Sequence, residues 1–167
     1  MLVKKILFLS FLFIAICKNI YAQGSLSELF RHGGAWITKD TILVAYGHNK
    51  FGRPNCGLFI STSFSMDTML AHAKRLGNCY DIPYIENRLG IEKNTWKGKA
   101  LIRFDVGYYQ LSELNLRWAT EEDIRCAGNI LHIKDAHKTS GGMPEAFINQ
   151  VPFESLYIEP KVLIPCP

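Results

Sequence analysis

The stretch "GLFISTSFSMDTMLAHAKRLG", residues 57–77, combines a strand pattern with a helix pattern. Its first part, residues 57–63, is rich in apolar and β-branched side chains and predicts a strand. Apolar residues then recur at helical spacing: Met66, Met69, Leu70, Ala73 and Leu76. Ser65 can cap the first turn, and Gly77 can end the helix. We therefore expect a strand that leads directly into a helix of residues 65–77.

Residues 99–106, "KALIRFDV", predict a second strand, because their side chains alternate between apolar and mixed positions. The residues of one side are Ala100, Ile102, Phe104 and Val106, and those of the other are Leu101, Arg103 and Asp105. This pattern suits a sheet with one buried face. On the polar side, we expect Arg103 to pair with an acidic residue.

Shorter patterns complete the expected architecture. Helices are predicted at residues 80–90, where Pro83 is tolerated near the start, and at residues 120–128, which open with a threonine cap and three acidic residues. A hairpin is expected in 35–47, a loop in 49–56, and late strands at 145–148 and 153–159. The sequence thus predicts one small α+β domain with a mixed or antiparallel sheet and two to three short helices.

The N-terminus carries the pattern of a secretory signal peptide. Lys4 and Lys5 precede an apolar run of about twelve residues, which is shorter than the roughly twenty that cross a bilayer. Cleavage after Ala22 would leave a mature domain of residues 23–167. We expect a secreted or periplasmic protein without a membrane span. A lipoprotein attached through Cys17 is less favoured, because bulky Ile16 precedes the cysteine.

Removal of residues 1–22 leaves 16 basic against 15 acidic residues, so bulk charge gives no support to nucleic-acid binding. Four cysteines remain, an even number that suits two disulfides in an oxidising compartment. The sequence allows three pairings. We favour Cys56 with Cys79 and Cys126 with Cys166, the latter tying down the proline-rich tail. The absence of a Cys-x-x-Cys spacing argues against a structural zinc.

Three short motifs contain candidate functional residues. "LFRHGG" contains Arg31, "FISTS" contains Ser61, Thr62 and Ser63 at a strand end, and "KTSGGMPEAFINQVPF" places Glu145 where a glycine-rich turn enters a strand. In order and element type, these motifs resemble the ADP-ribosyltransferase fold, in particular the class with an arginine, a Ser-Thr-Ser strand and a late glutamate.

The resemblance implies a function for each motif. Arg31 would hold the phosphate or ribose of NAD, and residues 61–63 would shape the nicotinamide pocket. Glu145 would be catalytic, because a fixed carboxylate stabilises positive charge that develops at C1′. NAD would be the substrate, and a protein, a small molecule or water would accept ADP-ribose. Met143 stands where arginine-modifying members of the family have a second glutamate, so the acceptor is left open.

A second similarity concerns "FGRPNCGLFIST", which resembles the Arg-x-x-x-Gly-x-aromatic-x-Ser pattern of bacterial NAD-glycohydrolase toxin domains. It would make Arg53 the phosphate ligand in place of Arg31. The stretch "TSGGMPEAFINQVP" is similar to the ends of toxin domains in bacterial polymorphic systems. That resemblance implies a possible immunity protein as partner.

Other interpretations of the same residues stay open. In one of them, the serines and threonine serve only as helix caps, and Glu145 only starts a strand. A metal-free ribonuclease could use His132 or His137 with Lys134 or Lys138. A non-enzymatic binding module could use exposed aromatic residues from the set Trp36, Trp96, Trp118, Tyr108 and Tyr109. The five histidines show no metal-ligand spacing.

Overall fold

A computed structural model describes residues 26–39, 50–51, 56–127, 133–135, 137–152, 155–156 and 160–167. The expected signal peptide, Arg53, His132 and the second half of the expected hairpin lie outside the described residues, as does most of the expected strand 153–159. No helix within the described part of the chain is long and apolar enough to cross a membrane.

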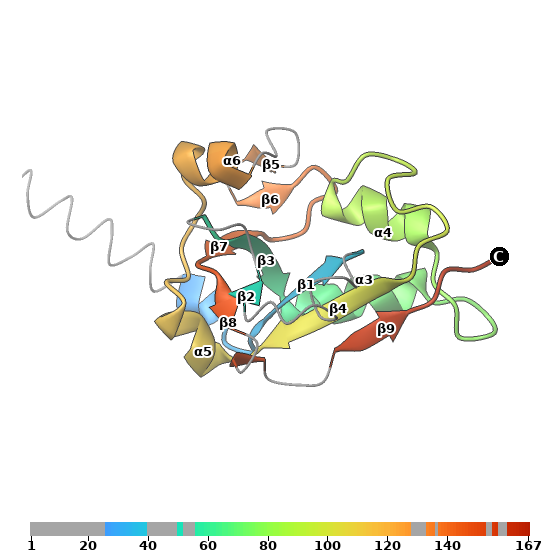
Figure 1. Ribbon diagram of the computed structural model, residues 1–167, viewed down its shortest axis with the longest axis horizontal. Coiled ribbons are helices and arrows are strands. Elements are labelled where there is room, and N and C mark those ends of the chain that lie inside the picture. Colours follow the sequence, from blue (N-terminus) through green and yellow to red (C-terminus); the bar gives the residue numbers. More distant parts are fainter. Residues whose placement is uncertain are drawn as a thin grey trace, which may run out of the picture.

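A five-stranded antiparallel sheet forms the centre of the fold (Figure 1). Its order is β7 (Ala146–Ile148), β3 (Leu58–Thr62), β1 (Gly34–Thr38), β4 (Leu101–Val106) and β9 (Lys161–Leu163). Strand β1 is therefore the middle strand, and it pairs with β3 on one side and β4 on the other. The α+β class with an antiparallel sheet, predicted from the sequence, is confirmed.

Smaller elements surround this sheet. Two further strand pairs are β2 (Lys50–Phe51) with β8 (Val151–Pro152), and β5 (Ile133–Asp135) with β6 (Lys138–Thr139). The helices are α3 (Ser63–Ala73), α4 (Ile82–Leu89), α5 (Tyr108–Glu113) and α6 (Glu121–Ala127), together with a helical turn at residues 26–29. The described residues thus contain more helical segments than the two to three expected.

Both faces of the sheet are covered, which corrects the expectation of one buried face. All six residues of β4 are buried. On one side, Phe104 packs with Trp36 in an apolar cluster, their rings stacked 5.1 Å apart. On the other side, Leu101 belongs to a second cluster that includes Met66 of α3 and Ile85 of α4. The alternation was predicted correctly, but the polar side of the strand faces α3 and not solvent.

The strand-helix unit of residues 57–77 is confirmed with shifted boundaries. The Thr62 side chain caps α3 by accepting a hydrogen bond of 3.1 Å from the backbone N–H of Ser65. The helix therefore starts two residues before the expected cap at Ser65. It also ends early, because Lys74 is extended and forms an antiparallel bridge with Tyr80. Gly77 lies in the turn that follows, with a positive φ of 84°.

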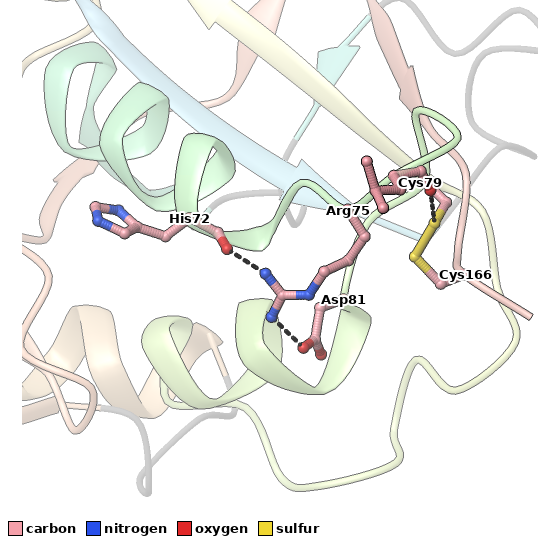
Figure 2. Close-up of a disulfide and its surroundings, with 6 residues drawn as sticks. His72, Arg75, Cys79, Asp81 and Cys166 are labelled. Carbon is pink, nitrogen blue, oxygen red and sulfur yellow. Dashed lines mark hydrogen bonds and ion pairs between the residues drawn. A yellow bond between two sulfur atoms is a disulfide. The ribbon is translucent and has the colours of Figure 1, made fainter.

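Two disulfides brace the domain, as predicted, but with different partners from those we favoured. Cys56 joins Cys126, and Cys79 joins Cys166. The second pairing arises because Tyr80 donates its N–H to Ile164 O and accepts from Cys166 N, which draws the C-terminal segment beside Cys79. Figure 2 shows Arg75 next to this disulfide, bound to the carbonyl oxygen of His72 and to Asp81.

Candidate functional site

The three motifs found in the sequence meet at one end of strand β3. On one side, Gly34 of β1 pairs with Thr62, and Ser63 N donates to Gly33 O over 3.1 Å. On the other side, Ile60 pairs with Ala146 of β7. The segments that hold Arg31, the Ser-Thr-Ser run and Glu145 therefore lie near the C-terminal end of β3, although up to 114 positions separate them in the sequence.

Gly33, directly before β1, lets the backbone pass close to the end of β4. Gly33 has a positive φ of 87°, and a Cβ atom at this position would lie 2.5 Å from Val106 O at the end of β4. Any other residue would be strained and would clash with backbone, which cannot move away as a flexible side chain could. The "HGG" sequence after Arg31 is thus explained by packing.

Glu145 has an unusual environment. The residue as a whole is half-buried, but its Oε2 atom is buried and has no hydrogen-bond partner among the described residues. Loss of solvation raises the pKa of Glu145 to about 8. The carboxyl group is therefore protonated and neutral at pH 7. A buried carboxyl group without a partner is costly in a folded protein, and such groups are enriched at functional sites.

The loop before Glu145 is fixed against helix α4. Gly141 accepts a 2.6 Å hydrogen bond from Arg88 Nη1, and a Cβ atom on Gly141 would lie 2.2 Å from Asn87 O. The Thr139 hydroxyl donates to Arg88 O over 2.8 Å and accepts from Met143 N over 3.0 Å. The glycine at position 141 is therefore needed for close approach, and the loop holds Glu145 in a defined place.

The three hydroxyl residues of β3 and α3 have different roles. The hydroxyl group of buried Ser61 donates a 2.7 Å hydrogen bond to Pro144 O, directly before Glu145. Thr62 caps α3, as one of our interpretations held. Ser63 is half-buried and lines a surface groove of about 690 Å³. Ser61 is thus the member of the motif that contacts the Glu145 loop.

Arg31 lies at the groove and not beside Glu145. It is exposed and bound to Glu28 over 2.6 Å, and its Nε donates to His32 Nε2 over 3.0 Å. Arg31 and Ser63 line the groove together with Tyr108 and Tyr109, but Glu145 is not among its lining residues. The structure therefore brings Arg31 close to the Ser-Thr-Ser run without placing it in one pocket with Glu145.

An ion-pair network forms the floor of this groove. Arg103 on β4 donates to both carboxylate oxygens of Asp105 and to Asp67 of α3. Burial by itself lowers the pKa of Arg103, but the hydrogen bonds and charges of the two aspartates outweigh it, so the pKa lies above its usual value. The predicted pairing of Arg103 with an acidic residue is confirmed. The two aspartates compensate the charge of Arg103, which explains why a buried arginine is tolerated.

The described residues of the ribonuclease alternative, Lys134, His137 and Lys138, lie on or directly beside the β5–β6 strand pair, next to the Glu145 loop. His137 is exposed and packs on Trp118 with ring centroids 4.0 Å apart, while its carbonyl oxygen accepts from Glu145 N. Trp36 and Trp96 are buried and serve the core, whereas Tyr109 is 80% exposed. Among the described residues, no group of three histidine, cysteine or acidic side chains could hold a metal ion.

Two residues near the candidate site are not indicated by sequence patterns. Asp67 lies on α3 and reaches Arg103 on β4. Arg88 was not singled out, because nothing in the spacing of a short helix shows that one of its arginines meets a loop 53 residues later. Both contacts depend on tertiary packing.

Comparison with known proteins adds no relative. No protein-family model matches the chain, and a search of curated proteins found no similar sequence.

Proposed function

We propose that this chain is a secreted, toxin-like enzyme that breaks the bond between nicotinamide and ribose in NAD, with Glu145 as the catalytic residue. ADP-ribose passes to an acceptor protein, a small molecule or water. The observation that carries the proposal is that Glu145 Oε2 is buried without a hydrogen-bond partner among the described residues, directly after Pro144, which accepts from Ser61 at the end of β3. The resemblance to ADP-ribosyltransferases rests on the three motifs of Arg31, Ser61–Ser63 and Glu145, which include these two positions.

The charge of the site fits this chemistry. A neutral acid in an apolar site loses its proton when a positive charge comes close, because the opposite charge favours the ionised form. The nicotinamide ring of NAD is such a charge. Binding of NAD is therefore expected to release a proton from Glu145 and to leave a carboxylate beside the reacting ribose.

The carboxylate then acts in the bond-breaking step. As the bond between C1′ and the ring nitrogen breaks, its electron pair neutralises the pyridinium ring and positive charge develops on the ribose. A fixed carboxylate in a site of low dielectric constant stabilises that charge. The acceptor's oxygen or nitrogen forms a new bond to C1′ and loses a proton, which completes the transfer.

Two features support the parts of the proposal that concern export and a toxin-like role. The N-terminal pattern of residues 1–22 predicts a signal peptide, and the two disulfides suit an oxidising compartment. An immunity protein is the partner that this class of secreted domain implies.

The test is nicotinamide release from NAD by the oxidised protein, with and without cell lysate. Release by the wild type that is lost in Glu145→Gln supports the proposal, and release only with lysate indicates a transferase. Glu113→Gln is the matched control, because Glu113 is exposed on α5. Absence of release by a folded wild type with lysate overturns the proposal. RNA cleavage that depends on His137 would then support the ribonuclease alternative.

A further inference from the structure

A second pocket, distinct from the groove, lies between α3, α4 and the loop before Glu145. Its volume is about 370 Å³, within the range of small-molecule sites. Helix α3 contributes Phe64 and His72, helix α4 contributes Tyr84 and Arg88, and the loop contributes Pro144. Pro144 lines the pocket and directly precedes Glu145 in the chain, so the pocket adjoins the loop that carries Glu145.

The lining of this pocket has a single sign of charge. Arg88 lines it, and none of the described residues that line it is acidic. The groove differs, because its lining contains both signs of charge: Asp67 and Asp105 lie there with the cations Arg31, Arg103 and Lys161. A pocket whose charged side chain is a cation attracts an anion, and the planar arginine group binds phosphate in a two-pronged geometry.

Arg88 also has an unused donor. Its Nη1 is held by Gly141 O, which fixes the guanidinium group, but its Nε is buried without a hydrogen-bond partner among the described residues. Buried donors are nearly always paired in native proteins. Because Arg88 lines the pocket, a ligand oxygen that enters it would meet this fixed guanidinium group.

Two aromatic side chains border the same space. Phe64 is 72% exposed, which is unusual for a large apolar side chain, and Tyr84 is half-buried opposite on α4. Aromatic faces of this kind stack on the ring of a base. Ser65 and Thr68 line the same pocket and make part of its wall polar.

We propose that this pocket binds a nucleoside phosphate, with Arg88 as the phosphate ligand and Phe64 as a stacking surface for the base. Identification of the natural ligand as NAD rests on the proposed function. In that case Arg88, and neither Arg31 nor Arg53, holds the NAD phosphate, because its pocket adjoins the loop that carries Glu145. The binding of a nucleoside phosphate as such stands on the pocket alone.

The experiment measures the binding of AMP, ADP-ribose and adenosine to the oxidised protein by calorimetry. Wild type is expected to bind AMP, and adenosine about tenfold or more weakly, because one charged hydrogen-bonded contact is lost. Arg88→Gln is expected to weaken AMP by a similar factor while leaving adenosine unchanged. Arg125→Gln, an exposed arginine on α6, is the charge-matched control and should bind like wild type.

Since Arg88→Gln also loses the bond to Gly141, Phe64→Ala provides a second variant at an exposed position. It should weaken AMP and adenosine alike without lowering the melting temperature. Wild-type affinity for AMP and ADP-ribose weaker than about 1 mM overturns the inference. Unchanged AMP binding in a folded Arg88→Gln protein overturns it as well.

The outcomes separate this inference from the proposed function. Arg88-dependent binding of ADP-ribose without any nicotinamide release would overturn the proposed function and support the nucleotide pocket. Nicotinamide release that needs Glu145 but keeps its KM in Arg88→Gln would support the function and overturn the assignment of Arg88 as the ligand of the NAD phosphate.

Discussion

The hydroxyl group of Ser61 and the carbonyl oxygen of Pro144 are joined by a 2.7 Å hydrogen bond across 83 residues of sequence. This bond connects the central region of the sheet to the loop that presents Glu145. Ser61 is buried, so no water replaces the hydroxyl group easily when it is removed. The bond therefore contributes both to stability and to the position of Glu145.

Substitution Ser61→Ala is expected to lower the free energy of unfolding by about 1–3 kcal/mol, because it leaves a partly buried carbonyl oxygen without its donor. Nicotinamide release should fall as well, since the loop is no longer fixed at Pro144. Ser63→Ala, at a half-buried groove position, is the control and should have a smaller effect on stability. Chemical denaturation of both variants measures the difference, and equal losses would contradict the assigned role of Ser61.

The raised pKa of Glu145 makes stability depend on pH. Below pH 4.5 the group is protonated in both the folded and the unfolded chain. Between pH 4.5 and about 8, the folded protein keeps a proton that the unfolded chain has released. The free energy of unfolding contributed by Glu145 thus falls as pH rises, by up to about 1.4 kcal/mol per pH unit.

Glu145→Gln removes this titration. The difference in unfolding free energy between wild type and variant should therefore change steadily in favour of the variant from pH 5 to 8, and then level off. Denaturant titrations at several pH values measure it. A constant difference across this range would show that the carboxyl group is ordinary in its pKa.

The network around Arg103 is expected to respond unequally to substitution. Arg103→Met leaves the Asp105 carboxylate, whose side chain is 12% exposed, without its cation and should cost about 3–5 kcal/mol. Asp67→Asn should cost less than about 1 kcal/mol, because the Asp67 side chain is 66% exposed. The double change Arg103→Met with Asp105→Leu should regain much of the loss. Thermal unfolding of the three variants measures these losses of stability. A loss for Asp67→Asn as large as that for Arg103→Met would contradict this ranking.

The disulfide pairing is open to direct mapping. Digestion without reduction, followed by mass spectrometry, should recover peptides that link Cys56 to Cys126 and Cys79 to Cys166. Replacement of both cysteines of either pair by serine should lower the free energy of unfolding by about 2–5 kcal/mol, since each bond closes a long loop. A peptide linking Cys56 to Cys79 would show that the pairing favoured from sequence was right after all.

Local features of this fold were predictable from the sequence because they depend on neighbours along the chain. Helix α4 follows its expected pattern, with Asp81 capping its start and Gly90 in a left-handed conformation at its end. The alternation in β4 also placed Arg103 and Asp105 on one side, and the pairing of Arg103 followed from it.

Features that join distant segments were not predictable in the same way. The cysteine pairing depends on how the C-terminal segment lies beside Tyr80, and the early end of α3 depends on the bridge between Lys74 and Tyr80. The motifs singled out Ser61 and Glu145 as candidates, and the structure connects them through the hydrogen bond from Ser61 to Pro144. Arg88 was missed because its significance comes only from the pocket that it shares with Pro144.

The positions of the two disulfides have a consequence for limited proteolysis. Their spans, 56–126 and 79–166, overlap, so a single cut anywhere from Cys56 to Cys166 leaves all pieces covalently joined. Strand β1 precedes both spans, and among the described strands it is the one that joins β3 to β4. One cut between Thr38 and Cys56 would release a fragment that contains β1 from covalent linkage to the rest of the chain. The β3 and β4 halves of the sheet would then be joined through a strand held only by hydrogen bonds and packing. The protein is thus suited to division into two chains that regain the sheet only when they recombine.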